Sequence, residues 1–407
     1  MNTPSTMAPR QAIAVFAVFA FAYFFSTLIR AITATLAPTL VTEFALNARD
    51  LGLLAGGYFL GFAAMQLPLG SWLDRYGPRK VIVLFLALAV VGCVAFSMAT
   101  SFVGLLAARA LCGVGVCACL MAPLTGYRRW FQPANQIRAN AWMLMVGAFG
   151  MVASTLPVQW LVPLVGWRVL FLGLGVLVAL AALLIILFVP AWEREPLQAQ
   201  VTAPGYAEVW ASRHFRSLVP LGFFNYGGLV AMQTLWAAPW MVKVAGYTPL
   251  QAATGLFWIN VSMLVAFWLW GLAMPALARN GLTVERMIAL GMPLSMLVLA
   301  IIVIAGPALS MASAAVWAVF CVSCTVGSFA QPAVGLAFRA ELAGRALSAF
   351  NLVIFCGVFA VQWGVGLLID GFQALGWAQP EAYQGAMGVY GLCCVASYVY
   401  FLVTKRP

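Results

Sequence analysis

The chain has 407 residues, of which 64% are apolar and only 8% are charged, and its mean hydropathy is +1.01. About a quarter of the residues in a soluble domain are charged, so this composition excludes a water-soluble globule and predicts a protein that crosses a membrane several times. The net charge of +11 does not by itself indicate a nucleic-acid partner, because basic residues also hold the cytoplasmic loops of membrane proteins in place.

Twelve apolar stretches are long enough to cross a bilayer as helices, which takes about 20 residues each. The first runs from Gln11 to Leu40 without a small-residue cleavage site, so it predicts a spanning helix rather than a signal peptide. An even number of spans places both termini on one side of the membrane. The predicted spans are centred near Ala22, Leu60, Leu88, Cys112, Gly150, Val178, Val230, Val261, Leu297, Val319, Ile354 and Ala396.

The distribution of basic residues indicates which side the termini occupy. Only Arg49, Arg168 and Lys243 fall on the side opposite the termini, whereas sixteen of the 21 basic residues fall on the same side. This asymmetry predicts a multi-pass protein of the cytoplasmic (inner) membrane with both termini in the cytoplasm. The two remaining arginines, Arg30 and Arg109, lie inside predicted spans. The sixteen are Arg10, Arg75, Arg79, Lys80, Arg128, Arg129, Arg138, Arg194, Arg213, Arg216, Arg279, Arg286, Arg339, Arg345, Lys405 and Arg406.

One long polar segment divides the chain into two halves of six predicted helices. The halves share a sequence feature, since Val-Gln-Trp at 158–160 recurs at 361–363 and a Gly-Trp pair follows in both cases. Two parallel six-helix repeats are typical of transporters whose binding site lies near the midplane between them. We predict an N-terminal six-helix bundle at 11–190, a cytoplasmic linker at 191–215 and a C-terminal six-helix bundle at 216–404.

The loop after the second predicted span reads Gly-Ser-Trp-Leu-Asp-Arg-Tyr-Gly-Pro-Arg-Lys at 70–80. It resembles the signature loop between helices 2 and 3 of the major facilitator superfamily. The fourth span at 109–115 resembles the RxxqGxg motif of the same superfamily, with Cys112 in place of the usual glutamine. A degenerate echo of the loop at 271–281 extends the resemblance to the second half. The signature residues are Gly70, Asp74, Arg75, Gly77, Arg79 and Lys80.

The resemblance implies an all-α integral membrane fold with twelve transmembrane helices in two pseudo-symmetric six-helix bundles. It also implies alternating-access transport, in which Asp74 and neighbouring arginines latch the cytoplasmic ends of helices in one state. The fifth span lacks the GxxxGPxxGG pattern of proton-driven drug antiporters and the Gly/Asn-rich signature of nitrate porters. The sequence therefore assigns the chain to neither subfamily.

Arg30 is the leading candidate for a substrate ligand. A charge at mid-bilayer costs about 2.5 to 3.5 kcal/mol, so such a residue usually faces a cavity and marks a substrate path. Helical spacing places it in a stripe with Tyr23, Thr27 and Thr33, and a guanidinium among hydroxyls suits a carboxylate or a phosphate. The alternative is an arginine bonded to backbone carbonyls or paired within its own half. Arg109 is a second candidate, although its motif favours a structural or conformational role.

Neutral polar side chains in the second half complete the candidate site. Each alone is more often an interhelical hydrogen bond than a ligand, but together they predict a wide pocket with aromatic walls. A further polar residue, Gln362, lies in the eleventh span. The candidates are Tyr226, Gln233, Trp236, Asn260, Gln331 and Asn351.

The acidic residues bear on how transport is driven. All ten fall at predicted helix ends or in loops, and the one histidine, His214, lies in the linker, so no such group is available near the midplane to carry a proton. We therefore predict transport of a small organic anion by exchange, by uniport, or by symport in which the substrate brings the proton. The alternative is proton-driven efflux of lipophilic or drug-like compounds, which requires a membrane-embedded acid.

Other classes of function find little support in the sequence. An enzyme needs a nucleophile, an acid–base pair or a metal cluster at membrane depth, and a receptor usually adds a sizeable soluble domain. The chain contains no GxxxxGK[ST] loop, which argues against direct drive by ATP. The nine cysteines lie in apolar stretches and predict no disulfide framework. We expect a monomer without cofactor, metal or nucleic acid, whose partners are a small molecule and the lipid bilayer.

Overall fold

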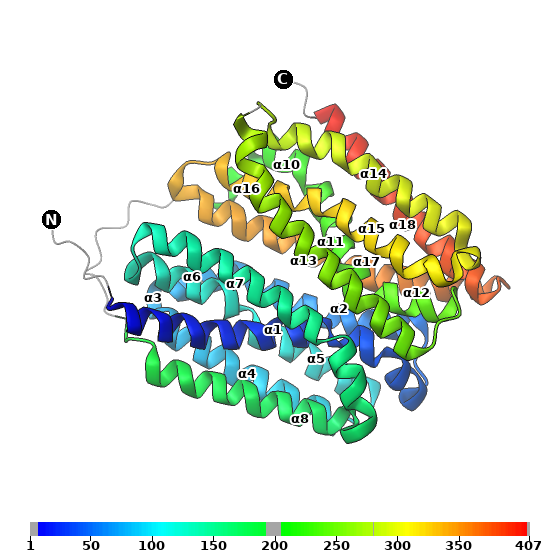
Figure 1. Ribbon diagram of the computed structural model, residues 1–407, viewed down its shortest axis with the longest axis horizontal. Coiled ribbons are helices and arrows are strands. Elements are labelled where there is room, and N and C mark those ends of the chain that lie inside the picture. The colour runs from blue at the N-terminus through cyan, green and yellow to red at the C-terminus, as the bar shows by residue number, and fades with distance from the viewer. Residues whose placement is uncertain (1–6, 193–204, 280, 405–407) are drawn as a thin grey trace. The chain divides into compact units, whose positions relative to one another are not determined.

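The computed structural model describes residues 7–192, 205–279 and 281–404, and all regular structure in those ranges is helical (Figure 1). The chain forms two compact units: Met1–Ile32 with Leu60–Val201, and Thr33–Phe59 with Thr202–Pro407. The domain boundaries expected at 11–190, 191–215 and 216–404 stay a prediction. Residues 193–204 of the expected linker lie outside the described residues.

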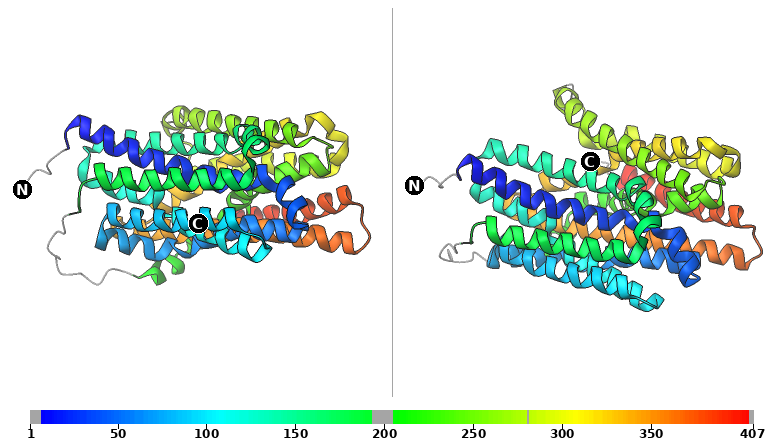
Figure 2. Two further views of the ribbon diagram at one scale, coloured as in Figure 1. Left: turned by 90° about the horizontal axis from the view of Figure 1, so that it is seen from below. Right: turned by 60° about the horizontal axis from the view of Figure 1, so that its bottom comes forward.

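The helices of the first unit run nearly parallel or antiparallel to one another (Figures 1 and 2). Ser101 begins α5 by accepting a hydrogen bond from the Gly104 N–H at 3.2 Å. Gly77 ends α3 with a φ of +79°, and Pro78 begins α4 directly after it. The helices are α1 (Pro9–Phe44, in this unit up to Ile32), α2 (Ala48–Ala64, in this unit from Leu60), α3 (Gln66–Tyr76), α4 (Pro78–Met98), α5 (Phe102–Val116), α6 (Ala118–Trp130), α7 (Pro133–Ala153) and α8 (Leu156–Phe188).

Glycine permits the closest helix approach in this unit. α4 packs along α5, and a Cβ on Gly115 would lie only 2.2 Å from the backbone nitrogen of Ala89. A Cβ on Gly92 would lie 2.8 Å from the backbone nitrogen of Cys112. Helices associate in lipid largely through small residues that let their backbones approach. Packing therefore accounts for the glycine at position 115 of the fourth-span motif.

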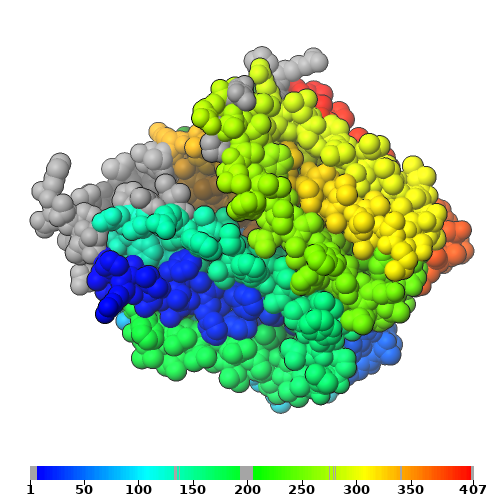
Figure 3. Space-filling model, viewed as in Figure 1, coloured from blue at the N-terminus to red at the C-terminus, as the bar shows by residue number. Residues whose placement is uncertain are grey.

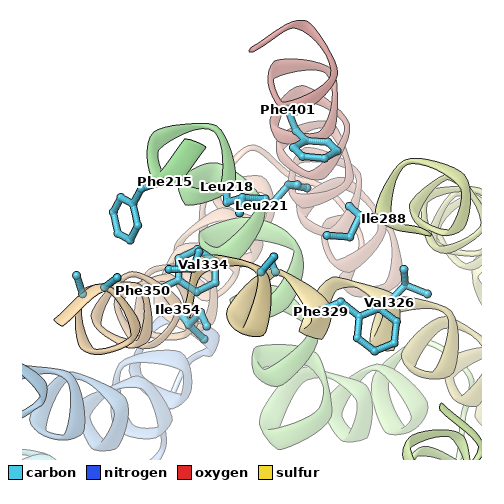
Figure 4. Packing of buried hydrophobic residues seen from close by; sticks show 14 of the residues in the cluster. Phe215, Leu218, Leu221, Ile288, Val326, Phe329, Val334, Phe350, Ile354 and Phe401 are labelled. Atoms are coloured by element: carbon cyan, nitrogen blue, oxygen red, sulfur yellow. The ribbon is translucent and has the colours of Figure 1, made fainter. Parts of the chain in front are cut away.

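The second unit has its own apolar core, shown in Figure 4, where α10 and η1 meet α14, η4, α16, α17 and α18. The rings of Phe215 and Phe350 are fully buried there and meet edge to face at 6.1 Å. Two π turns, η1 and η2, interrupt the seventh span, and η3 and η4 are 3₁₀ turns. After the remainder of α1 and α2, the elements are α9 (Tyr206–Ala211), α10 (Arg213–Pro220), η1 (Leu221–Tyr226), α11 (Gly227–Ala231), η2 (Met232–Trp236), α12 (Ala237–Lys243), α13 (Pro249–Arg279), α14 (Val284–Ala305), η3 (Gly306–Ala312), α15 (Ser313–Cys324), η4 (Thr325–Phe329), α16 (Ala330–Leu336), α17 (Ala340–Ala374) and α18 (Gln379–Thr404).

Among the described residues, eight helical stretches are long and apolar enough to cross a membrane, or nine when the bent pair α2 and α3 counts as one span. One of the eight, Val284–Leu336, is 53 residues long and contains two spans, which meet at η3. The total is twelve when α7 and the interrupted helix from α10 to α12 are also included. The predicted all-α membrane fold with twelve transmembrane helices is thus confirmed.

Large apolar side chains cover the outward surface of the spans. On α14, Leu290, Leu297 and Ile304 are spaced by seven residues and are 74%, 59% and 81% exposed. The surface of α14 lies open on the face drawn in Figure 3. A stripe of this kind is stable against hydrocarbon and prone to association in water. The exposed surface therefore agrees with a location in the bilayer.

The packing of α4 against α5 generates a stability prediction. Gly115→Ala places a methyl group against the backbone of Ala89, and we expect it to lower the free energy of unfolding by about 1 to 3 kcal/mol. Gly173→Ala on α8 is the matched control, because a Cβ there meets no atom within 4 Å and alanine stabilises a helix. Melting temperatures of the two purified variants test this, and equal values would contradict it.

Candidate functional site

Arg30 lies well inside α1, in the part of that helix that belongs to the first unit, and its side chain is half-buried. Its guanidinium carbon lies 5.3 Å from the centroid of the Phe62 ring, which is a cation–π contact. The Tyr23 hydroxyl and the Cys119 thiol are near enough to interact electrostatically with Arg30. The structure thus places a positive charge among a phenyl ring, a phenol and a thiol inside a membrane-spanning helix.

The hydroxyl groups predicted to line up beside Arg30 make different contacts in the structure. Tyr23 interacts with Arg30, whereas Thr27 donates its hydroxyl to a backbone carbonyl of its own helix at 3.0 Å. Thr27 also packs against α7, since a Cβ on Gly150 would lie 2.1 Å from Thr27 Oγ1. Thr33 is buried in the second unit. A ligand role for these hydroxyls stays a prediction, and helix packing accounts for the position of Thr27.

Arg109 is fully buried and ties α5 to α1 within the first unit. Its Nη1 donates to the backbone carbonyl of Ile29 at 2.7 Å, and its Nη2 donates to that of Arg30 at 3.0 Å. Hydrogen bonds from a charged donor to buried carbonyls are stronger than neutral ones. Arg109 therefore holds the backbone of α1 at the residue that carries the other intramembrane charge. This geometry favours a positioning role over direct contact with a substrate.

The predicted amide residues of the second unit form pairs between neighbouring segments. Gln233 Nε2 donates to Asn260 Oδ1 at 2.7 Å, which joins η2 to α13. Gln331 Nε2 donates to Asn351 Oδ1 at 2.7 Å, which joins α16 to α17. Interhelical hydrogen bonds of this kind contribute about 0.6 to 2 kcal/mol in membranes. The structure therefore brings these four residues together in two pairs, in the interhelical role that the sequence left open beside a ligand role.

Trp236 belongs to a buried network that the sequence did not reveal. Its Nε1 donates to the backbone carbonyl of Gln362 at 3.1 Å, and Gln362 Nε2 donates to Thr234 Oγ1 at 3.0 Å. Gln362 Oε1 is buried and has no hydrogen-bond partner among the described residues. A buried acceptor without a protein donor commonly binds water or a ligand. The signal that could have identified Gln362 is its place in the middle of the repeated Val-Gln-Trp.

The three candidates chosen on the seventh span all lie in its π turns. Tyr226 ends η1, while Gln233 and Trp236 lie in η2. A π turn displaces the following side chains relative to a regular α-helix, and such turns occur frequently at functional sites. Helical spacing at 3.6 residues per turn therefore could not predict which of these side chains share a face.

The signature loop joins α3 to α4 in the first unit. Asp74 and Arg75 are exposed in the last turn of α3, and Gly77 supplies the positive φ between the two helices. Arg79 Nη2 donates to the backbone carbonyl of Ile186 at 2.6 Å and so joins the start of α4 to the end of α8. The two remaining signature residues are exposed; they are Gly70 and Lys80. The latch role expected for this loop stays a prediction.

A cavity of about 260 Å³ lies within the second unit. Its walls come from α1, α2, α12, α13, α17 and α18, and its polar groups include Lys243, Asp370 and Tyr383. None of the residues predicted to bind substrate lines it. In the sequence, Lys243 is only a loop charge and Asp370 only an acid near a helix end. They meet because three pairs of consecutive helices, which are distant from one another along the chain, converge in the fold.

A family model described as Major Facilitator Superfamily matches residues 19–362. Over 150 residues the chain is 27% identical to the hexuronate transporter of Escherichia coli (strain K12), and the match covers 37% of this chain and 35% of that protein. Over 154 residues it is 27% identical to the "Probable sulfoacetate transporter SauU" of Cupriavidus necator, with 38% and 36% covered. The chain therefore matches only about a third of the length of these curated relatives.

The fold also has a counterpart among solved structures. A bacterial homologue of the human lysosomal transporter Spinster, crystallised in an inward-facing and unoccupied conformation, superposes with a TM-score of 0.78 at 17% sequence identity. The match covers 98% of both chains. At this identity the likeness shows the fold alone.

The contacts of Arg109 generate a prediction about stability. Arg109→Lys replaces a planar fork of donors by a single ammonium that cannot hold both carbonyls of α1, and we expect about 1 to 3 kcal/mol less stability. Arg213→Lys on α10 is the matched control, because Arg213 is exposed. The measurement is the melting temperature in detergent. If Arg109→Lys melts like the control, Arg109 does not tie α5 to α1.

Proposed function

This chain belongs to the major facilitator superfamily, and we propose that it carries a small organic anion across the cytoplasmic membrane by alternating access, as a secondary active or facilitative transporter. The observation that carries the proposal is Arg30, a guanidinium held beside Phe62 and Tyr23 well inside α1. A charge costs about 2.5 to 3.5 kcal/mol at mid-bilayer, and charged residues inside spans usually mark a substrate or ion path. The planar fork of Arg30 matches the two oxygens of a carboxylate.

The names of the relatives support an anionic substrate. The hexuronate transporter and the "Probable sulfoacetate transporter SauU" are both named for small molecules that carry a carboxylate. These two molecules share a carboxylate and differ in the rest, because hexuronates bear several hydroxyls and sulfoacetate bears none. For this chain we therefore propose only the class that the two molecules have in common, a small organic anion.

The positions of the acidic residues support a mechanism without a protein proton carrier inside the membrane. Each acidic residue within the described ranges lies near the end of a long helix or in the short α9. Exchange, uniport, or symport in which the substrate brings its own proton therefore fits the chain better than proton-driven efflux of lipophilic compounds. Outside the described residues lie Glu193 and Glu195. The acids within the described ranges are Glu43, Asp50, Asp74, Glu208, Glu285, Glu341, Asp370 and Glu381.

The remaining parts of the proposal concern setting and movement. We propose a monomer in the cytoplasmic membrane with both termini in the cytoplasm, because the basic residues concentrate on the side of the termini. The partners are the lipid bilayer and a small molecule, and the proposed movement is a rocking of the two halves of the chain. The signature loop, with Asp74 and Arg75 exposed at its start, is the proposed cytoplasmic latch.

Exchange in liposomes tests the proposal. The purified protein is reconstituted, and uptake of radiolabelled D-glucuronate against unlabelled D-glucuronate inside is measured without a pH gradient. We expect Arg30→Gln to lower the exchange rate at least about tenfold, because the carboxylate loses a charge-assisted hydrogen bond. Arg30→Lys retains the charge and should fall between the wild type and Arg30→Gln.

The control for this experiment is Arg213→Gln, an exposed arginine of α10, which should exchange at the wild-type rate. Melting temperatures confirm that all variants are folded. If Arg30→Gln exchanges at the wild-type rate, Arg30 does not bind the substrate. Expulsion of lipophilic cations driven by a proton gradient, with no exchange of anions, would favour the efflux alternative.

A further inference from the structure

We propose that the cavity of the second unit is a separate binding site for a small hydroxylated carboxylate, at the end of the protein that the charge distribution assigns to the outside. The inference rests on the proposed function for its ligand class and goes beyond it in place and residues. The cavity measures about 260 Å³, and every residue that lines it belongs to the second unit. It is lined by residues of α2, α12 and α17 close to the ends of these helices, as well as by α1, α13 and α18.

One buried phenol and three exposed polar side chains line this cavity. Tyr383 is only 5% exposed, and the part of the chain that the structure describes offers its hydroxyl no hydrogen-bond partner. Lys243, Gln373 and Gln379 also line the cavity, and these three residues are exposed, so their polar groups can be reached by a ligand from solvent. A phenol buried beside a cavity without an acceptor is costly unless something enters to accept its hydrogen bond.

The one carboxylate in the cavity wall is already engaged. Asp370 Oδ1 accepts a hydrogen bond from the Ala48 N–H at 3.1 Å, and its Oδ2 accepts one from the Arg49 N–H at 2.8 Å. These two residues begin α2, so the carboxylate faces the partial positive charge of a helix N-terminus. These contacts hold the carboxylate of Asp370 in place against α2, and among the residues that line the cavity only Lys243 carries a positive charge. The site consequently favours an anion over a cation.

The same carboxylate favours hydroxyl groups on that anion. A carboxylate offers about four acceptor positions, and the N–H groups of Ala48 and Arg49 use two of those on Asp370. Asp370 also lies near enough to Tyr383 to interact electrostatically with it. A ligand with both a carboxylate and hydroxyls therefore satisfies both kinds of group: its carboxylate pairs with Lys243, and its hydroxyls donate to Asp370 and accept from Tyr383. An anion without hydroxyls leaves the remaining positions on Asp370 unused.

The position of the cavity in the second unit suggests the step of transport at which it binds a ligand. In the predicted topology, Lys243 and Arg49 are two of the three basic residues on the side opposite the termini. The cavity therefore lies at the outer end of the second unit, whereas Arg30 lies well inside α1 of the first unit. A carboxylate arriving from outside meets Lys243 before it reaches the membrane interior. The cavity would therefore bind substrate that arrives from outside, at a site separate from Arg30.

Counting bound ligand tests this arrangement. The purified protein in lipid nanodiscs is titrated with radiolabelled D-glucuronate, and the number bound per chain is measured at saturation. We expect two per chain in the wild type, one in Lys243→Gln, one in Arg30→Gln, and none in the double variant. Tyr383→Phe removes only the hydroxyl and should weaken the outer site about threefold to tenfold. Sulfoacetate, which lacks hydroxyls, should bind the outer site more weakly than D-glucuronate does.

Matched controls distinguish an effect on the cavity from the general effect of losing a charge or a hydroxyl elsewhere. Tyr400→Phe removes a hydroxyl from the exposed side of the same helix, and Arg213→Gln removes an exposed charge from α10; both should bind two ligands. Neutral D-glucose should bind at neither site. Melting temperatures without ligand show whether Lys243→Gln and Tyr383→Phe are folded, and Lys243→Arg, which keeps the charge, should restore the second ligand.

The possible results distinguish this proposal from the proposed function. One D-glucuronate per wild-type chain, lost in Arg30→Gln and unaffected in Lys243→Gln, would overturn the outer site and leave the Arg30 site intact. One per chain, lost in Lys243→Gln and unaffected in Arg30→Gln, would support the cavity and overturn the Arg30 site. No binding by the wild type would overturn both. Equal loss in Tyr383→Phe and Tyr400→Phe would overturn the assignment of the Tyr383 hydroxyl.

Discussion

Polar groups that enter the hydrocarbon must find their partners within the protein, because lipid supplies none. The backbone meets this demand by forming helices, which make up all regular structure in the described ranges. Side chains meet it by pairing across helices, as Gln233 does with Asn260 and Gln331 with Asn351. A polar atom left without a partner in such a chain therefore stands out. Among the described residues, Gln362 Oε1 in the second unit and the Tyr127 hydroxyl in the first are buried atoms of this kind.

The two arginines inside spans stabilise their charge through different contacts. Arg109 satisfies its guanidinium on backbone carbonyls of α1 and is fully buried. Arg30 is half-buried beside a phenyl ring and a phenol. One of the carbonyls that Arg109 holds is that of Arg30 itself, so the buried arginine helps to position the other. The two arginines thus fix the backbone of α1 at Arg30 within the first unit.

Some expectations depended on features that a linear pattern records well. The number of spans follows from apolar length, and the family follows from the loop at 70–80 and the motif at 109–115. Gly115 is a case where the motif and the packing agree, since the backbone of Ala89 leaves no room for a side chain. The stripe around Arg30 was predicted less completely. Helical spacing placed Tyr23 and Thr27 together, but it could not show that Thr27 faces α7, because spacing describes one helix and not its neighbours.

Taken alone, the sequence determined the membrane class, the family, the likeness of the two halves and the presence of two charges within spans. These are local or periodic properties, and each depends on composition or on residues near one another along the chain. Only the tertiary structure decided the partners of Arg109, the π turns that rotate the seventh span, and the cavity where Lys243, Asp370 and Tyr383 meet. Arg109 meets a carbonyl 80 residues away and Asp370 meets Ala48 322 residues away, and no pattern along the chain records which helices will become neighbours. The π turns are local, but they depart from the regular helical spacing that a sequence pattern assumes.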